Sequence, residues 1–139
     1  MVRRFPRANQ LVLAVLRPAL APVDVFSLLP DLTQTPPPVV MARRVAGTAY
    51  DPRVGYDQAV VDVQCWHTTD ADADDLADAC RTALITAWRN QTVVPGVGSI
   101  AHYTEQAAPV LLPASSQSDP VPAGVYRYQS TYVLGLRTA

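Results

Sequence analysis

Acidic side chains gather between Asp70 and Asp75 in this chain of 139 residues, where they could bind a metal ion. The run begins like a calcium-binding loop. Such a loop needs Gly at its sixth position and Glu at its twelfth, but these positions hold Asp75 and Arg81. We therefore interpret the run as the acid-rich start of a helix, where the positive end of the helix dipole favours carboxylates.

The only two histidines, His67 and His102, could bind zinc together with Cys65 and Cys80. No C-x-x-C or H-x-x-x-H spacing supports such a site, so we expect no metal. Cys65 and Cys80 are predicted to project toward the same core, which favours two buried free thiols. A disulfide bond is the alternative, and it would require an oxidising compartment.

Motifs for nucleophilic catalysis and for phosphate binding are missing from the sequence. It contains no G-x-S-x-G, and no cysteine lies in an evident electropositive turn. The segment Gly96-Val97-Gly98 lacks the third glycine and the following helix of a dinucleotide-binding loop. Asn90-Gln91-Thr92 matches a glycosylation sequon, which has meaning only in a secreted protein. We therefore expect neither catalytic residues nor a cofactor.

The arginines Arg3, Arg4, Arg7, Arg43 and Arg44 could together contact a polyanion. The net charge of −1 favours a solvated surface instead, and it gives no basic footprint for tight nucleic-acid binding. No apolar run reaches about 18 residues, so we expect no membrane span. The apolar segment at 11–16 is too short for a signal peptide, and no cleavage site follows it.

A strand that leads directly into a helix, over residues 56–88, organises the chain. Residues 59–66 alternate with a period of two: Ala59, Val61, Val63 and Cys65 share one face, and Val60, Asp62, Gln64 and Trp66 share the other. Thr69 or Asp70 is the expected N-cap of the helix. A period of 3.6 then predicts one apolar stripe, formed by Ala73, Leu76, Ala77, Cys80, Ala83, Leu84, Ala87 and Trp88.

Weaker patterns predict the other elements of the chain. We expect a helix at 11–16 that Pro18 limits, strands at 23–28, 39–45, 98–106 and 126–136, and loops at 30–38, 48–55, 90–98 and 107–124. The last loop is long and rich in proline and serine. The last strand places on one face Tyr126, Tyr128, Tyr132, Leu134 and Leu136.

These elements predict an α+β fold in which residues 1–139 form a single domain. Their order is α-β-β-β-α-β-β, which favours a mixed, mainly antiparallel sheet of about five strands with two helices packed on one face. The opposite face of the sheet is polar, with scattered large residues such as Trp66. Such a face is either solvated or a surface for a partner.

Taken together, the elements resemble the tail terminator (tail completion) proteins of long-tailed, siphovirus-type bacteriophages. The resemblance covers the chain from about Phe5 to Arg137 and includes the acidic, Ala-rich helix. Its motifs are Phe5-Pro6, Val23-Asp24-Val25, Leu29-Pro30, the segments 38–40 and 44–47, Val61-Asp62-Val63 to Trp66, and a closing strand with the pattern Tyr-x-x-Thr-Tyr-x-Leu.

The resemblance implies a structural virion protein that is not an enzyme and carries no cofactor. It implies a homo-oligomeric, hexameric ring in the neck region of the virion, assembled in the host cytoplasm without a membrane. The ring would cap the head-proximal end of the tail tube and end tube polymerisation. It would contact the major tail tube protein and a head connector or head-closure protein, and let DNA pass without sequence-specific binding.

Several residues are candidates for the contacts with these partners. They are Trp66, Arg43, Arg44 and four prolines of the 107–124 loop, namely Pro109, Pro113, Pro120 and Pro122. Prolines restrict a loop in advance, so that it loses less entropy when it becomes ordered on contact. Two alternatives stay open: another neck component, such as a head-closure or adaptor protein, and a small α+β ligand-binding domain or enzyme.

Overall fold

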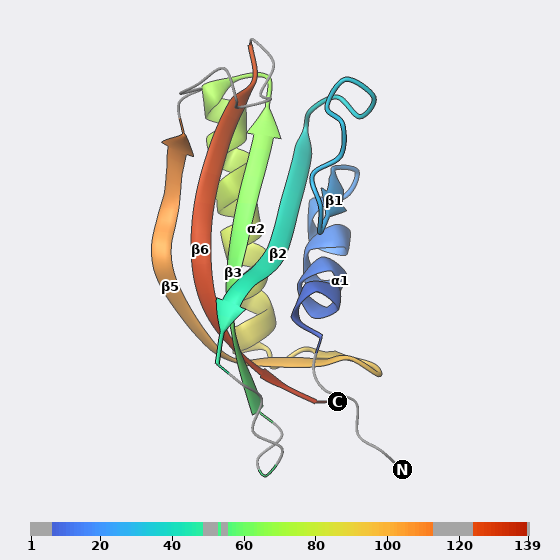
Figure 1. The fold of residues 1–139 in the computed structure, drawn as a ribbon, viewed down its shortest axis with the longest axis vertical. Helices are drawn as coiled ribbons and strands as arrows, with labels where there is room; N and C mark the ends of the chain where they lie inside the picture. Colours follow the sequence, from blue (N-terminus) through green and yellow to red (C-terminus); the bar gives the residue numbers. More distant parts are fainter. Residues whose placement is uncertain (1–6, 49–52, 54–55, 113–123, 139) are drawn as a thin grey trace.

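The computed structural model of the chain describes residues 7–48, 53, 56–112 and 124–138. In these residues two helices and six strands follow one another in the order αβββαβββ (Figure 1). They are α1 (Ala8–Leu20), β1 (Asp24–Phe26), β2 (Val39–Gly47), β3 (Tyr56–His67), α2 (Asp70–Arg89), β4 (Val93–Val94), β5 (Gly98–Leu112) and β6 (Tyr126–Arg137).

All six strands belong to one sheet with the order β1-β2-β3-β6-β5-β4. β1 pairs with β2 in parallel, and the other neighbours pair antiparallel. The predicted α+β class with a mixed, mainly antiparallel sheet is confirmed. The strand that the sequence did not predict is β4, which has two residues and lies inside the predicted 90–98 connection.

Both helices lie on the same face of the curled sheet, as predicted (Figure 1). α2 packs against β3, β5 and β6, whereas α1 packs against β1, β2 and α2. Because the helices cover this face alone, the main core forms between them and the sheet. Neither helix in the described part of the chain has the length and hydropathy to span a membrane.

The predicted apolar stripe of α2 supplies much of this core. Leu76, Cys80 and Leu84 are buried against Val61, Val63 and their neighbours on β3, and Ala83 and Trp88 lie partly buried at the margin of the stripe. The hydroxyl of Thr69 accepts a hydrogen bond from the backbone N–H of Asp72 at 3.1 Å, which confirms Thr69 as the N-cap. The sequence pattern of this strand and helix therefore matches the structure closely.

Helix α1 continues past Pro18 and ends at Leu20, so the predicted limit at Pro18 was wrong. A proline inside a helix removes one backbone N–H and its hydrogen bond. Here that loss falls in the last turn, where few further bonds depend on it. Leu20 follows Pro18 and is buried in the main core, and its burial offsets part of the cost.

Strand β5 extends to Leu112, so the loop predicted over 107–124 was wrong for residues 107–112. This segment pairs with β6, with Ala107 opposite Thr131 and Leu112 opposite Arg127. Two register shifts, between Glu105 and Ala107 and between Ala107 and Val110, fit the irregular sequence into the ladder. Residues 113–123 of the predicted loop lie outside the described residues.

The outer face of the sheet, opposite the helices, is only partly polar. In its middle the Asp62 carboxylate accepts hydrogen bonds from the side-chain amides of Gln64 at 2.8 Å and Gln129 at 2.7 Å. Trp66 also lies on this face but is 1% exposed, because Leu32 and Val39 pack with it in a second, smaller cluster. The expectation that Trp66 stands as a spare aromatic on an open face is therefore corrected.

Candidate interaction surfaces

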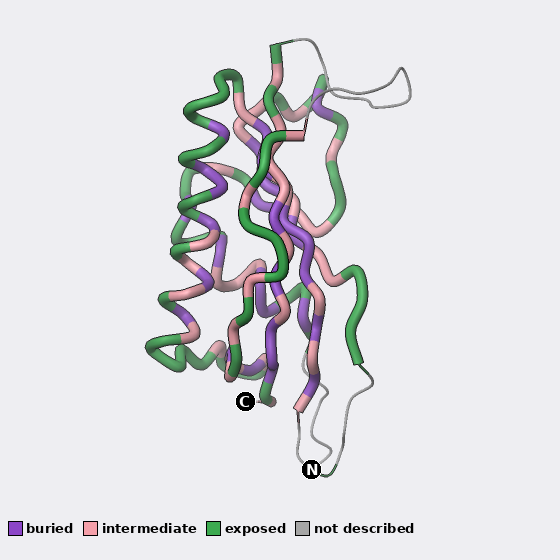
Figure 2. The backbone as a smooth tube through the Cα atoms, turned by 90° about the vertical axis from the view of Figure 1, so that its left-hand side faces the viewer, coloured by how far each residue is buried: buried purple, intermediate pink, exposed green. Residues whose placement is uncertain are grey.

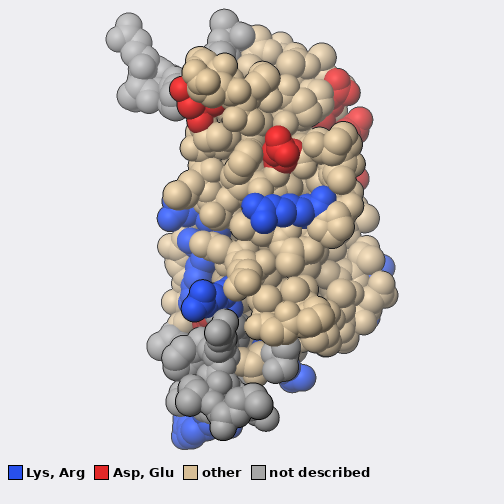
Figure 3. Space-filling view, turned by 90° about the vertical axis from the view of Figure 1, so that its right-hand side faces the viewer, with Lys and Arg blue, Asp and Glu red and all other residues tan. Residues whose placement is uncertain are grey.

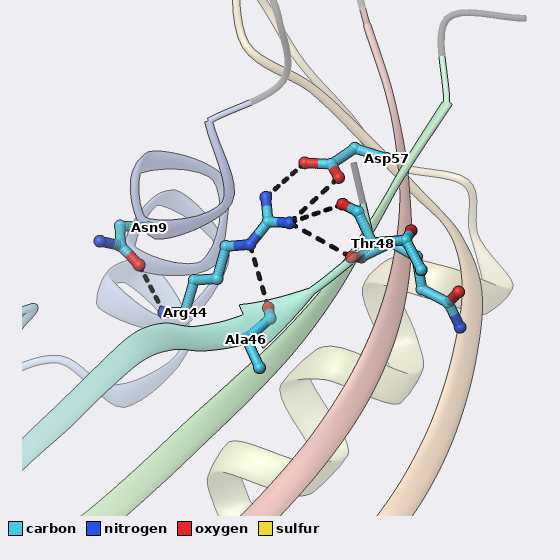
Figure 4. A network of polar contacts seen from close by, with 6 residues as sticks. Asn9, Arg44, Ala46, Thr48 and Asp57 are labelled. Atoms are coloured by element: carbon cyan, nitrogen blue, oxygen red, sulfur yellow. Dashed lines mark hydrogen bonds and ion pairs between the residues drawn. The ribbon is translucent and has the colours of Figure 1, made fainter. Parts of the chain in front are cut away.

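Arg44 lies at the centre of a polar network where β2 meets β3 (Figure 4). Its Nη1 forms an ion pair with Asp57 Oδ2 at 2.5 Å, and its Nη2 donates to Asp57 Oδ1 at 3.2 Å. The same side chain donates to the backbone carbonyls of Ala46 at 3.0 Å and Thr48 at 3.1 Å. The backbone N–H of Arg44 donates to Asn9 Oδ1 of α1 at 2.6 Å.

This network stabilises an irregular end of the β2–β3 ladder. The register shifts between Arg44 and Ala46, and a bulge of this kind leaves backbone groups without their ladder partners. The Arg44 guanidinium donates to two carbonyls next to this shift and compensates the Asp57 carboxylate, which is almost fully buried. Arg44, a predicted partner contact, thus makes its described interactions within its own chain.

Arg43 and Arg44 do not form one basic patch, because successive residues of a strand point to opposite faces. Arg43 lies on the outer face, where its register partner is Asp62. That carboxylate already accepts hydrogen bonds from the two glutamines described above. Arg43 is half-buried, and its Nε has no hydrogen-bond partner among the described residues. Arg7 is exposed just before α1, and Arg3 and Arg4 lie outside the described residues.

The face formed by α1, β1 and β2 carries arginine side chains in its middle and lower parts and acidic side chains above them (Figure 3). The helix α2 shows the same polarity along the molecule. Its first turns expose Asp70, Asp72 and Asp74 beside the end of β3. Its last residue, Arg89, is exposed at the other end, as is Arg137 at the end of β6. The two ends of the molecule therefore differ in charge.

A hydrogen bond joins the acidic end to the sheet. The Tyr128 hydroxyl of β6 donates to Asp70 Oδ1 at 2.5 Å. This bond to a carboxylate is the main cause that raises the pKa of Tyr128 from 10.0 to about 12. The contact fixes the beginning of α2 over β6, so that its carboxylates are held at one end of the sheet.

The remaining predicted contacts do not converge on one place. Trp66 is buried in the smaller cluster, and its Nε1 has no hydrogen-bond partner among the described residues. Pro109 lies half-buried on β5. Pro113, Pro120 and Pro122 lie outside the described residues. Among the predicted contact residues that the structure describes, Trp66, Arg43, Arg44 and Pro109 thus do not come together as a site.

Two pairs of exposed apolar residues were missed in the sequence, and they lie at opposite edges of the sheet. Leu28 and Leu29 follow β1, and Val110 and Leu111 belong to β5. The sequence contains only a partial signal, since each pair consists of two adjacent apolar residues, and Leu28 ends the strand predicted at 23–28. The side chains of such pairs bury little apolar surface within their own chain and remain available for contact with another molecule.

A shallow groove of about 520 Å³ runs between the two helices and ends at β4. Small aliphatic residues and threonines line it, and none of the lining residues ionises: Ala14, Val15, Pro18, Ala19, Ala79, Thr82, Ala83, Thr86, Ala87, Thr92 and Val94. The groove therefore offers no acid, base or nucleophile that could act on a bound molecule.

The two cysteines and the other potential metal ligands do not form a site in the described part of the chain. No group of three or more His, Cys, Asp and Glu side chains there could hold a metal ion. Cys65 and Cys80 are buried and free, as predicted. Their mutual hydrogen bond and their burial raise the pKa of Cys65, which keeps its thiol protonated and weakly nucleophilic.

Comparison with known families gives one match over nearly the whole chain. A family model described as phage tail termination protein matches residues 4–137. A search of curated proteins finds no match to the chain. The family match includes both helices and all six strands of the described residues, together with the two apolar edge pairs.

Proposed function

Because the chain belongs to the phage tail termination protein family, we propose that it forms a ring that closes the head-proximal end of the tail tube. As a member of this family it is a structural protein of a phage tail and a component of the virion. The proposed ring is a hexamer of identical chains, assembled in the host cytoplasm. It ends tube polymerisation and joins the tail to the head connector or head-closure protein.

The match of one family to nearly the whole chain carries this proposal. The geometry of the described residues supports it in two respects. A ring needs two different side surfaces on each subunit, because a head-to-tail contact that closes on itself is heterologous. The two edges of the sheet provide such different surfaces, since β1 and β2 form one edge and β5 with the short β4 forms the other. A ring between the tube and the head also needs two different ends, and the ends of this molecule differ in charge.

The proposed ring surrounds the path of the DNA without reading its sequence. The chain has a net charge of −1 and lacks the basic footprint of a protein that binds nucleic acid tightly. DNA can therefore pass through such a ring without a tight contact that would hold it in place.

The proposal is tested by deleting the gene in the phage that encodes this chain and examining the particles by electron microscopy. We expect headless tails with tubes of irregular, extended length. Expression of the wild-type protein from a plasmid restores tails of uniform length joined to heads. If tails of normal length form without the protein, the proposed terminator function is wrong.

Binding experiments separate the terminator from another neck component. The purified protein is mixed with tail tubes isolated from the deletion phage and, separately, with heads filled with DNA. A terminator binds the open end of the tubes before any head is added. A head-closure or adaptor protein binds the heads and leaves the tubes free. Native mass spectrometry of the tube-bound and free protein gives the number of subunits.

A further inference from the structure

The two edges of the sheet differ in how far their outward backbone N–H and C=O groups are covered. At the β1–β2 edge, side chains of α1 satisfy two outward backbone groups, the Val25 carbonyl and the Arg44 N–H. Arg17 donates from Nε and Nη2 to the Val25 carbonyl at 3.2 and 3.1 Å, and Asn9 accepts from the Arg44 N–H. Such capping prevents another strand from pairing with this edge.

The β5 edge is open over most of its length. β4 pairs only with Gly98 and Ser99, and the rest of β5 has no strand on its outer side among the described residues. No residue of β5 after Ile100 is buried (Figure 2). Three register shifts and Pro109, which lacks an N–H, interrupt this edge and disfavour the regular addition of a long strand. After Pro109 the segment 110–112 is regular again and pairs residue for residue with β6.

One cross-strand row runs across the sheet from Val110 of β5 to Phe26 of β1. Val110 lies opposite Gln129 of β6, Gln129 opposite Gln64 of β3, Gln64 opposite Met41 of β2, and Met41 opposite Phe26 of β1. Val110 and Phe26 therefore mark the two ends of one row, at the same level along the strands. Leu28 and Leu29 follow β1 after Ser27, two and three residues beyond Phe26.

The exposure of these side chains is high for their type. Leu28 is 66% exposed, Leu29 36%, Val110 53% and Leu111 41%. Val110 and Leu111 point to opposite faces of the sheet, so their side chains flank the β5 edge from both sides. A copy of the molecule displaced sideways along the row brings this edge beside Leu28 and Leu29 of the next chain. Neither pair can reach the other within one chain, because the whole width of the sheet separates them.

We propose that neighbouring copies of this chain join through these two pairs, with Val110 and Leu111 of one copy packed on Leu28 and Leu29 of the next. The inference rests on the proposed ring and specifies its lateral contact. Side chains make the contact, since Arg17 caps one edge and Pro109 interrupts the other. The contact is heterologous and can therefore repeat around a closed ring. It also sets the acidic ends of all subunits on one face of the ring and the basic ends on the opposite face.

The test compares two double variants with wild type by native mass spectrometry and by sedimentation, both free and bound to tail tubes. One variant carries Val110→Lys and Leu111→Lys, and the other carries Leu28→Lys and Leu29→Lys. The matched control is Val93→Lys, which charges an equally exposed valine on β4. We expect each double variant to be monomeric with an unchanged circular dichroism spectrum, and the control to form the wild-type oligomer. An equimolar mixture of the two double variants gives dimers and nothing larger, because each retains one intact edge.

Three outcomes overturn the inference. If either double variant forms the wild-type oligomer, the proposed lateral contact is wrong, whereas the proposed ring is not contradicted. If the Leu28/Leu29 variant still dimerises alone, whereas the Val110/Leu111 variant does not, two β5 edges pair symmetrically instead. If the wild-type protein is monomeric even on tail tubes, the proposed ring and this contact are both wrong.

Cross-linking keeps the inference testable if a lysine variant fails to fold. The variant Leu28→Cys with Val110→Cys is oxidised under conditions where the buried native cysteines do not react. We expect a ladder of disulfide-linked oligomers, and no ladder from either single cysteine variant. A double variant that assembles like wild type but gives no ladder contradicts the proposed contact.

Discussion

Cys65 of β3 and Cys80 of α2 face each other across the main core, with their sulfur atoms 3.7 Å apart. A disulfide bond requires about 2.05 Å, so both residues are thiols in this structure. Because both are buried, we expect a thiol reagent to react with neither in the native protein and with both after unfolding without reductant. The measurement is a thiol count before and after denaturation. Fewer than two thiols in the unreduced, denatured protein, with a mass lower by two hydrogens, would establish a disulfide instead.

The core around these cysteines was predictable because the sequence pattern within each of its two elements is enough to identify the buried face. Strand β3 and helix α2 each bury one face, so the periods of 2 and 3.6 appear directly in the order of apolar and polar residues. Thr69 and the acids that follow it mark the beginning of the helix for an equally local reason. The fold class followed from these two elements and the final strand.

The errors concern segments whose structure depends on distant residues. The part of β5 around Pro109 has no alternation and becomes a strand because β6 pairs with it. Trp66 shows the alternation of an outward residue, but Leu32, from a segment far away in the sequence, covers it. The edge pairs were missed for a related reason. Whether an apolar residue is exposed depends on which strand forms the edge, and only the order of the strands shows that.

Replacement of Leu84 by alanine tests whether the stripe of α2 is the core. Leu84 is fully buried, so the variant loses transfer free energy and leaves a cavity. We expect the free energy of unfolding to fall by about 2–5 kcal/mol, measured by chemical denaturation. Thr82→Ala, at an exposed position of the same helix, is the control and should change it by no more than about 0.5 kcal/mol. Equal midpoints for Leu84→Ala and wild type would show that this side chain contributes nothing to the core.

The protein should lose stability when the pH rises above 10. Burial, followed by the Glu105 carboxylate, raises the pKa of Tyr103 from 10.0 to about 12. The hydrogen bond to Asp70 raises that of Tyr128 to the same range, and burial raises that of Tyr132 further. In the unfolded chain these groups lose their protons near pH 10.0, whereas the folded chain retains them. Unfolding therefore releases protons in this range and becomes more favourable as the pH increases.

The alkaline loss of stability is measured as the free energy of unfolding at a series of pH values, together with the near-ultraviolet absorbance of tyrosinate. We expect stability to decline between pH 10.0 and about 12, and the absorbance of these tyrosines to increase only above pH 10.0. Tyr103→Phe and Tyr128→Phe should each make the decline less steep, because each removes one group that titrates. A decline that neither substitution changes would mean that other groups cause it.

The Arg44–Asp57 ion pair allows a prediction about which partner is costlier to remove. Asp57 has a side chain that is 5% exposed, whereas that of Arg44 is 32% exposed. The variant Arg44→Met leaves the buried carboxylate without its cation and the carbonyls of Ala46 and Thr48 without their donor. Asp57→Asn leaves Arg44 partly in water and still bound to those carbonyls. An unsatisfied buried group costs more than a solvated one, so Arg44→Met should be the more damaging change.

We expect Arg44→Met to lower the free energy of unfolding by about 1–3 kcal/mol, and Asp57→Asn to lower it by less. The double variant should be more stable than the sum of the two single losses indicates, because it no longer buries an unpaired charge. Arg43→Met is the control, since it removes the neighbouring arginine, which makes no ion pair with Asp57. Chemical denaturation of all four variants gives the comparison. If Asp57→Asn costs as much as Arg44→Met, or if the losses simply add, the pair does not stabilise the end of the β2–β3 ladder in this way.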